Sequence, residues 1–250
     1  MSGKTKCSLG FIKKSPIDYY IYANTLYNRK YEECFDNDGY TQEMMVEFMI
    51  KNKMWTLQEE EEYKNIYKNI DSLKVDLYNA YSGFANRDKI RGDLQRIRKR
   101  KDILTSKRST YDYLTCEYFA YCAKSLYLIW AGVVDENNNK VFGEPFEKTE
   151  YPLLFSVFSE MNNERVSEEN LRQISKLSQW RVLWSIGKDN IFGKSVMDLT
   201  DEQLSLMMWS RFYDNIHESM ECPPNEVIDD DDMIDGWSIV QRRKREEDKN

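Results

Sequence analysis

The chain has 250 residues, with 36 basic and 43 acidic side chains that give a formal net charge of −7. A net negative protein is not expected to bind nucleic acid or an anionic membrane with its whole surface. Only ten glycines and five prolines accompany 17 tyrosines, 11 phenylalanines and six tryptophans. Few tight turns disfavour sandwiches, barrels and glycine-rich nucleotide folds. The composition predicts a mostly α-helical bundle with long antiparallel helices and a small irregular or β-hairpin insertion.

The cysteines and the single histidine exclude several site chemistries. The five cysteines form an odd set without a CxxC pair, and the N-terminus lacks the apolar run of a secretory signal. We therefore expect a cytoplasmic protein. His217 cannot by itself assemble an imidazole-rich metal site. Cys116 and Cys122 lie in apolar helical surroundings that are typical of core residues. We expect no catalytic residue, no cofactor and no metal.

The first part of the chain, residues 1–40, is predicted to be an N-terminal arm or a set of short elements, because Pro16 and the turn signal at residues 36–39 interrupt it. Residues 41–131 are predicted to form a helical hairpin and a core helix. Thr41 precedes a helix over residues 42–52. Thr56, followed three residues later by Glu59, forms a capping box that begins the next helix.

From that cap, apolar residues recur at three- and four-residue steps as far as Leu104, which is the period of an amphipathic helix. Two shapes fit this pattern, one very long helix or an αα-hairpin that turns near residues 83–86. Gly83 and Gly92 favour the hairpin because glycine weakens a helix. The next helix, residues 113–131, is apolar almost all round and is expected in the middle of the bundle. Lys124 lies within this apolar stretch and argues against a membrane span.

Residues 132–166 are predicted to be a loop or small hairpin insertion, with a short helix that begins at Pro152. Residues 167–222 are predicted to hold the C-terminal helices. Ser167 caps a helix over residues 168–186, and Thr200 with Gln203 three residues later forms a second capping box. Residues 187–195 resemble a phosphate loop in their glycines and lysine. Their spacing is one residue too long and they follow a helix, so they predict a helix C-cap and an irregular connection.

Residues 223–250 are predicted to be an acidic-to-basic C-terminal docking segment, in which Met233 and Trp237 lie on one helix stripe. The run of four aspartates at 229–232 partly fits a calcium loop, but the alternation fails at Met233. The other interpretations are a solvated acidic helix N-terminus or a docking patch. The partner interface that we hypothesise consists of Trp209, Phe212, Tyr213, Asp229, Asp230, Asp231, Asp232 and Trp237. The aromatic members also fit a helical core.

The strongest charge feature is the segment 87–108, which holds ten basic and three acidic residues. A basic helix face of this kind could bind phosphates, with a patch at Arg96, Arg98, Lys99, Arg100 and Lys101. Alternatively, the segment could pair with the acidic residues of 59–62 or 218–235, within one molecule or between subunits. The negative net charge favours pairing with protein. Aromatic residues do not interleave the basic run, which argues against stacking on single-stranded nucleic acid.

The C-terminal stretch from Trp209 to Lys249 resembles the ends of tail-assembly and virion-morphogenesis proteins of large tailed bacteriophages. The resemblance covers an aromatic helix, the Pro223-Pro224 break, an acidic turn into Trp237 and a tail rich in Gln, Arg and Lys. It has no diagnostic motif, so it transfers no site residue. It implies a non-enzymatic helper or structural component, such as a tail assembly chaperone that shields the apolar, helical tape-measure protein.

The sequence therefore predicts a non-enzymatic assembly or structural protein that acts through protein–protein contacts, such as a phage tail assembly chaperone or virion component. Its expected partners are other proteins of an assembly, including further copies of itself, and no membrane. The alternative is a nucleic-acid-binding adaptor that uses the basic face of residues 87–108. A third, weaker hypothesis is a carboxylate metalloenzyme centred on residues 229–232.

Overall fold

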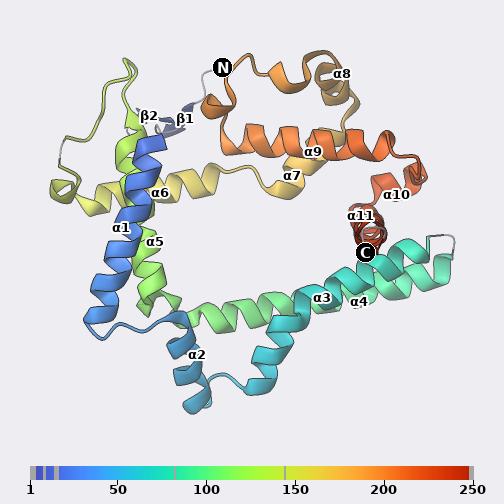
Figure 1. Ribbon diagram of the computed structural model, residues 1–250, viewed down its shortest axis with the longest axis horizontal. Helices are drawn as coiled ribbons and strands as arrows, with labels where there is room; N and C mark the ends of the chain where they lie inside the picture. The colour runs from blue at the N-terminus through green and yellow to red at the C-terminus, as the bar shows by residue number, and fades with distance from the viewer. Residues whose placement is uncertain (1–3, 8–9, 14–16, 82, 144, 248–250) are drawn as a thin grey trace. The chain divides into compact units, whose positions relative to one another are not determined.

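The computed structural model describes residues 4–7, 10–13, 17–81, 83–143 and 145–247, and the protein is mostly α-helical, as the composition predicts (Figure 1). The chain divides into two compact units. Unit 1 comprises Met1–Gly39 and Cys116–Ser219, and unit 2 comprises Tyr40–Thr115 and Met220–Asn250. Each unit is thus built from two separate parts of the sequence, an arrangement that the predicted succession of segments did not contain.

Unit 1 begins with a small sheet and a long helix. Strand β1 (Lys4–Cys7) pairs antiparallel with β2 (Gly10–Lys13), which pairs antiparallel with β3 (Val133–Val134). Helix α1 (Ile17–Asp36) follows and packs along α5 (Cys116–Gly132). The prediction of an arm or short elements over residues 1–40 missed this 20-residue helix. Its buried residues Ala23 and Leu26 do follow a helical step.

The core of unit 1 lies around the second half of α5. Leu126, Tyr127, Ile129 and Trp130 are buried there, and Phe146 packs edge-on against the rings of Tyr127 and Trp130. The first half of α5 differs from the prediction of a central helix, because Tyr118, Phe119 and Tyr121 are exposed. In the first half of α5 only Cys116 and Ala120 are buried, so its apolar sequence leaves these three aromatic side chains exposed.

The predicted insertion of residues 132–166 contains β3, an irregular connection and a helix. Residue Val134 also forms an isolated bridge with Lys140, and the carboxylate of Asp135 accepts hydrogen bonds from the backbone amides of Asn137 and Asn139. A 3-10 turn, η2 (Phe146–Lys148), leads to α6 (Tyr151–Glu164), which has proline near its start as predicted. Strand β3 therefore pairs with the N-terminal strand β2 and also bridges to Lys140 within the insertion.

Three further helices complete unit 1. They are α7 (Glu168–Lys176), α8 (Ser178–Gly187) and α9 (Asp201–His217), with short 3-10 turns η3 (Lys188–Asn190) and η4 (Val196–Asp198) between α8 and α9. Ser167 and Thr200 cap α7 and α9 as predicted. The single helix predicted over residues 168–186 is wrong. Leu177 adopts ψ 135°, an extended conformation that separates α7 from α8.

Unit 2 begins with α2 (Gln42–Lys51) and an antiparallel helical hairpin. Helix α3 (Leu57–Asn79) and α4 (Phe84–Arg108) pack against each other, which confirms the hairpin and excludes the single long helix. The capping box of Thr56 and Glu59 is present. A 3-10 turn, η1 (Ser109–Leu114), follows α4.

The remaining helices of unit 2 come from the end of the chain. Helix α10 (Asn225–Asp229) follows the two prolines, and α11 (Asp231–Glu247) packs against α3. Met233, Ile234 and Trp237 of α11 are buried. In the part of the chain that the structure describes, no helix combines the length and apolar character needed to cross a membrane.

Candidate functional site

The basic segment 87–108 lies on α4, and most of its basic side chains are paired with acidic side chains of the same unit. Eight of its ten basic residues form ion pairs. Six of these pairs join α4 to another helix, and the pairs of Arg96 with Asp93 and of Lys101 with Asp102 are local. Lys89 and Lys99 are exposed. Below, the ion-pair network means these six interhelical pairs together with the pairs of Lys74, which join α3 to α11.

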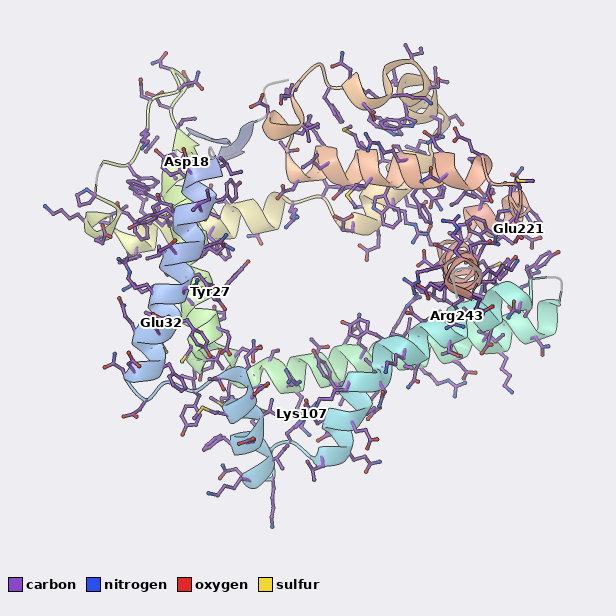
Figure 2. The ribbon with its side chains drawn as sticks, viewed as in Figure 1. Asp18, Tyr27, Glu32, Lys107, Glu221 and Arg243 are labelled. Atoms are coloured by element: carbon purple, nitrogen blue, oxygen red, sulfur yellow. The ribbon has the colours of Figure 1, made fainter. Side chains whose placement is uncertain are left out.

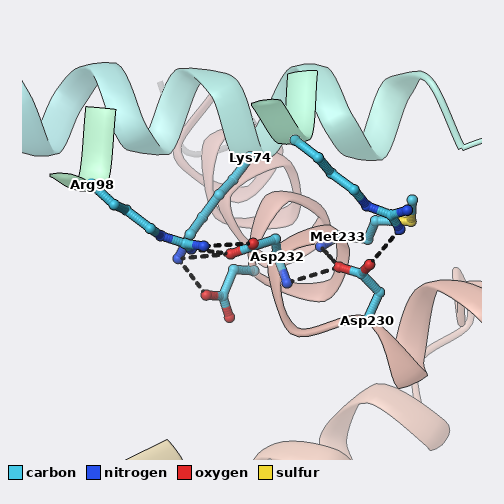
Figure 3. A network of polar contacts seen from close by, with 7 residues as sticks. Lys74, Arg98, Asp230, Asp232 and Met233 are labelled. Carbon is cyan, nitrogen blue, oxygen red and sulfur yellow. Dashed lines mark hydrogen bonds and ion pairs between the residues drawn. The ribbon is translucent and has the colours of Figure 1, made fainter. Parts of the chain in front are cut away.

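One half of the ion-pair network joins α4 to the C-terminal helices (Figure 3). Arg87 Nη1 lies 2.6 Å from Glu226 Oε1, and Arg91 Nη2 lies 2.7 Å from Asp230 Oδ2. Arg98 donates two hydrogen bonds to Asp232, of which the one from Nη1 to Oδ2 is 3.0 Å long. The acidic stretch 218–235 therefore does meet the basic helix within one chain.

The other half joins the end of α4 to the beginning of α3. Arg100 donates to both carboxylate oxygens of Glu62, at 2.8 and 2.7 Å. Lys107 Nζ lies 2.6 Å from Glu59 Oε1, and Arg108 Nε lies 3.0 Å from Glu60 Oε2. Because the hairpin is antiparallel, acidic residues at the positive end of α3 face basic residues at the negative end of α4. Both helix dipoles favour that arrangement.

Asp230 connects the ion-pair network to the start of α11. Its Oδ1 accepts hydrogen bonds from the backbone amides of Asp232 (3.0 Å) and Met233 (2.9 Å), while its Oδ2 pairs with Arg91. Lys74 Nζ of α3 lies 2.6 Å from Asp235 Oδ2 and 3.9 Å from Asp232 Oδ1. One aspartate thus satisfies otherwise unpaired amides at a helix N-terminus and neutralises a guanidinium.

The pKa shifts follow these contacts. Hydrogen bonds from Lys107 and Arg100 lower the pKa values of Glu59 and Glu62, respectively. Burial alone would raise the pKa of Glu60, but hydrogen bonds from Arg108 and Trp55 lower it on balance. The hydrogen bonds with Asp232 raise the pKa of Arg98. Each shift favours the charged form, so the pairs hold one another ionised.

The aspartate run 229–232 has the wrong surroundings for a cation. Asp230 and Asp232 already face Arg91, Arg98 and Lys74, whose positive charges oppose a metal ion at the same carboxylates. Within the described ranges, no group of three or more metal-ligating side chains converges. The arrangement can hold helices together, but it does not gather carboxylates for metal-assisted chemistry.

The aromatic residues of the hypothesised partner interface are mostly internal. Tyr213 is 1% exposed and Trp237 is 4% exposed, so the prediction of an exposed docking segment is corrected for both. Trp209 and Phe212 are half-buried, and the guanidinium of Arg172 lies 4.6 Å from the Trp209 ring centre. Arg172 also donates to the hydroxyl of Tyr213 at 3.0 Å.

A second polar cluster joins α8 to α9. The indole nitrogen of Trp184 donates to Asp214 Oδ2 at 2.7 Å, and Arg181 donates to the other carboxylate oxygen. Burial would raise the pKa of Asp214, but the hydrogen bonds from Trp184 and Arg181 lower it on balance. This cluster fixes the inner face of α8 and thereby decides which residues of α8 face water.

The outer face of α8 carries a set of apolar side chains that the sequence analysis did not identify. Val182, Leu183 and Ile186 are 60%, 57% and 82% exposed, whereas Trp184 between them is 1% exposed. These three residues are called the α8 stripe below. The apolar period of residues 168–186 was assigned to one continuous helix face. The break at Leu177 gives α8 an orientation of its own. The sequence pattern alone does not show that some of its apolar side chains are left exposed.

The remaining features are the connection at residues 187–195, His217 and a surface hollow. Residues 187–195 follow α8 as a C-cap and irregular connection, in which Lys188 adopts φ 37°. His217 lies in the last turn of α9. A surface hollow on α1 is lined by Tyr27, Asn28, Tyr31 and Glu32, of which Figure 2 labels Tyr27 and Glu32. All four residues belong to one helix, so the hollow is not an enclosing site.

The chain was also compared with known proteins. No protein-family model, no curated protein and no solved structure matches this chain.

Proposed function

We propose that this chain is a non-enzymatic assembly or structural protein that acts through protein–protein contacts. The observation that carries the proposal is the α8 stripe. Its three large apolar side chains adjoin one another on one short helix, and water covers more than half of each. A contiguous apolar set of this kind is typical of a surface that a partner polypeptide covers.

The first half of α5 supports the same proposal. Tyr118, Phe119 and Tyr121 are 45%, 50% and 54% exposed within a single turn of that helix. Aromatic side chains contribute large contact areas at low entropic cost and are frequent among the residues that dominate interface energies. Unit 1 therefore offers two apolar helix surfaces, on α5 and α8.

The resemblance of Trp209–Lys249 to bacteriophage tail-assembly proteins gives this proposal its biological setting. In that setting the chain acts as a tail assembly chaperone or virion component in the host cytoplasm. Its partner is an apolar, helical polypeptide of the growing particle. Apolar helix surfaces suit such a partner, because burial of apolar area on both sides drives the association.

The alternative, a nucleic-acid adaptor that uses the basic face of residues 87–108, has less support. Four of the five patch residues (Arg96, Arg98, Arg100 and Lys101) are engaged with carboxylates, and only Lys99 is an exposed cation with no such pair. A phosphate would have to displace those carboxylates. The ion-pair network therefore favours a structural use of the basic helix.

The test of the proposed function replaces two residues of the α8 stripe, in a Leu183→Glu, Ile186→Glu double variant. The matched control places the same charge on exposed polar positions of the same helix, in a Gln179→Glu, Ser185→Glu double variant. We expect the wild type and the control to co-purify with a stoichiometric partner from the cells that express them. The stripe variant should lose this partner while keeping the same melting temperature.

Two outcomes would contradict the proposal. One is a wild-type protein that purifies as a monodisperse species without any stoichiometric partner, and the other is a stripe variant that retains the partner in full. Fluorescence anisotropy with duplex DNA and with RNA tests the alternative. The adaptor hypothesis requires tight, steeply salt-dependent binding that a Lys89→Glu, Lys99→Glu variant weakens.

A further inference from the structure

Two cysteines that are far apart in the sequence meet at one end of unit 1. Cys34 lies in the last turn of α1, and Cys116 is the first residue of α5. Both sulfurs face the backbone of Gly39. A Cβ built on Gly39 would lie 2.5 Å from Cys34 Sγ and 2.8 Å from Cys116 Sγ. The missing side chain of Gly39 therefore provides the space in which the two thiols approach each other.

From this arrangement we propose that Cys34 and Cys116 form a dithiol that is reversibly oxidised to an intramolecular disulfide, a modification site that covalently joins the end of α1 to the beginning of α5. A disulfide requires two cysteine side chains that point toward each other from neighbouring backbones. Both sulfurs lie within 2.8 Å of the point that a Gly39 Cβ would occupy, so they face the same small space.

The surrounding backbone holds this geometry in place. The amide of Gly39 donates to the carbonyl of Cys34 at 2.9 Å, and the amide of Asn37 donates to the same carbonyl at 3.2 Å. Immediately beyond the two cysteine segments in sequence, Tyr40 and Thr115 form a β-bridge. Helices α1 and α5 pack along each other, which keeps the backbones of the two cysteines close together.

The different exposure of the two thiols sets the order of the reaction. Cys34 is half-buried, whereas Cys116 is 0% exposed. An oxidant of the small-molecule disulfide class, such as oxidised glutathione, therefore meets Cys34 first. The Cys34 thiolate attacks one glutathione sulfur, the glutathione disulfide bond breaks, and one glutathione thiolate leaves.

The second step forms the internal bond. Cys116, after losing its proton to solvent, attacks the Cys34 sulfur of the mixed disulfide, and the second glutathione leaves as a thiolate. In total, two protein thiols become one disulfide while one molecule of oxidised glutathione is reduced to two thiols. Burial and the hydrogen bond with Cys34, with a smaller contribution from Glu117, raise the pKa of Cys116 to about 12. The mixed disulfide on Cys34 is therefore the first product to accumulate.

Two further cysteines provide internal controls. Cys122 is half-buried beside the hydroxyl of Tyr118, and Cys222 is exposed in unit 2. Neither lies in the cluster of Cys34, Cys116 and Gly39. If oxidation simply followed accessibility, Cys222 would be modified at least as readily as Cys34. The position of the disulfide therefore distinguishes a specific pair of thiols from oxidation of any exposed cysteine.

The test treats the full wild-type chain with oxidised glutathione and maps its peptides without reduction. We expect one internal disulfide between Cys34 and Cys116, reversed by dithiothreitol. The melting temperature should be higher in the oxidised than in the reduced protein, because the bond closes a long loop in the unfolded chain. A Cys116→Ser variant should stop at the mixed disulfide, with glutathione retained on Cys34.

A second measurement applies if a cysteine variant does not fold. Phenylarsine oxide bridges two adjacent thiols, and the wild type should bind one arsenical that protects Cys34 and Cys116 together from alkylation. Glutathione retained separately on both cysteines, a disulfide that instead uses Cys122 or Cys222, or only intermolecular disulfides would each overturn the proposal.

Discussion

Arg98 of α4 donates two hydrogen bonds to the carboxylate of Asp232 in α11, across a separation of 134 residues in sequence. This contact lies at the centre of the ion-pair network, beside Lys74. A bidentate pair of this kind fixes the orientation of the two helices more strictly than a single ion pair, because the guanidinium and the carboxylate are both planar.

The first prediction concerns the strength of this pair. A double-mutant cycle with Arg98→Gln and Asp232→Asn should give a coupling free energy of about 1 kcal/mol, because both groups are only partly exposed and the contact is bidentate. Urea denaturation followed by circular dichroism measures it. The coupling should fall when the salt concentration rises.

The control for that cycle is the pair of Arg96 and Asp93, which lies three residues apart on α4 and leaves Arg96 largely exposed. It should couple by only about 0.3 kcal/mol. Equal coupling in the two cycles would mean that the contact between helices contributes no more than a local surface pair.

The second prediction concerns the closest approach of two helices in unit 2. A Cβ on Gly236 would overlap the carbonyl oxygen of Lys74 and lie 2.6 Å from its carbonyl carbon. Gly236→Ala should therefore lower the free energy of unfolding by about 2 kcal/mol or more, because backbone atoms of α3 would have to move.

Gly92 of α4 provides the matched control, since a Cβ there meets nothing within 4 Å. Gly92→Ala should raise the free energy of unfolding by about 0.5–1 kcal/mol, because alanine favours the helix. Both variants are measured by urea denaturation. If Gly236→Ala proved as stable as Gly92→Ala, α11 would not pack against α3 at this position.

The third prediction is a pH dependence that comes from Glu60. Its carboxylate accepts hydrogen bonds from the indole of Trp55 (2.9 Å) and from Arg108 (3.0 Å). Because its pKa is lower in the folded than in the unfolded chain, the stabilisation is present above the unfolded pKa. It is lost as the pH falls through the folded pKa.

The measurement compares the wild type with Glu60→Gln by urea denaturation over a range of pH. At neutral pH the wild type should be more stable by about 1–3 kcal/mol, since the charged hydrogen bonds are intact. The difference should shrink as the pH falls below the ordinary glutamate value of 4.5. A difference that stays constant down to acidic pH would exclude Glu60 as the titrating group.

The fourth prediction concerns unit 1, where Asp214 accepts hydrogen bonds from Trp184 and Arg181. Asp214→Ala should lower stability by about 1–3 kcal/mol, because it leaves two partly buried donors without an acceptor. Asp189→Ala, which removes an exposed pair with Arg211, should cost about 0.5 kcal/mol or less. Hydrogen exchange at the amides of α8 and α9 reports the loss, and similar exchange in both variants would contradict it.

Local signals predicted several helix boundaries correctly. Thr41, Thr56, Ser167 and Thr200 each cap the helix that the sequence assigned to them. A cap is readable from sequence because the side chain bonds to a backbone amide only two or three residues away. The hairpin was favoured for a similarly local reason, since glycine at position 83 interrupts the helical pattern.

Predictions that depended on the environment of a helix were less successful. The many polar tyrosines and asparagines of residues 17–36 hid α1, whose apolar contacts come from α5. The apolar period continued through Leu177, where the backbone turns, so α7 and α8 were merged. In both cases packing against distant residues overrides local preference.

The sequence by itself determined the mostly helical class, the caps, the hairpin of α3 and α4 and the presence of complementary charged segments, because each depends on residues a few positions apart. Only the tertiary structure decided which carboxylate meets which guanidinium, which aromatic residues are buried, which face of α8 remains apolar and exposed, and that Cys34 meets Cys116. Those relationships join residues brought together from distant parts of the chain by packing of whole helices, which leaves no short-range pattern in the sequence.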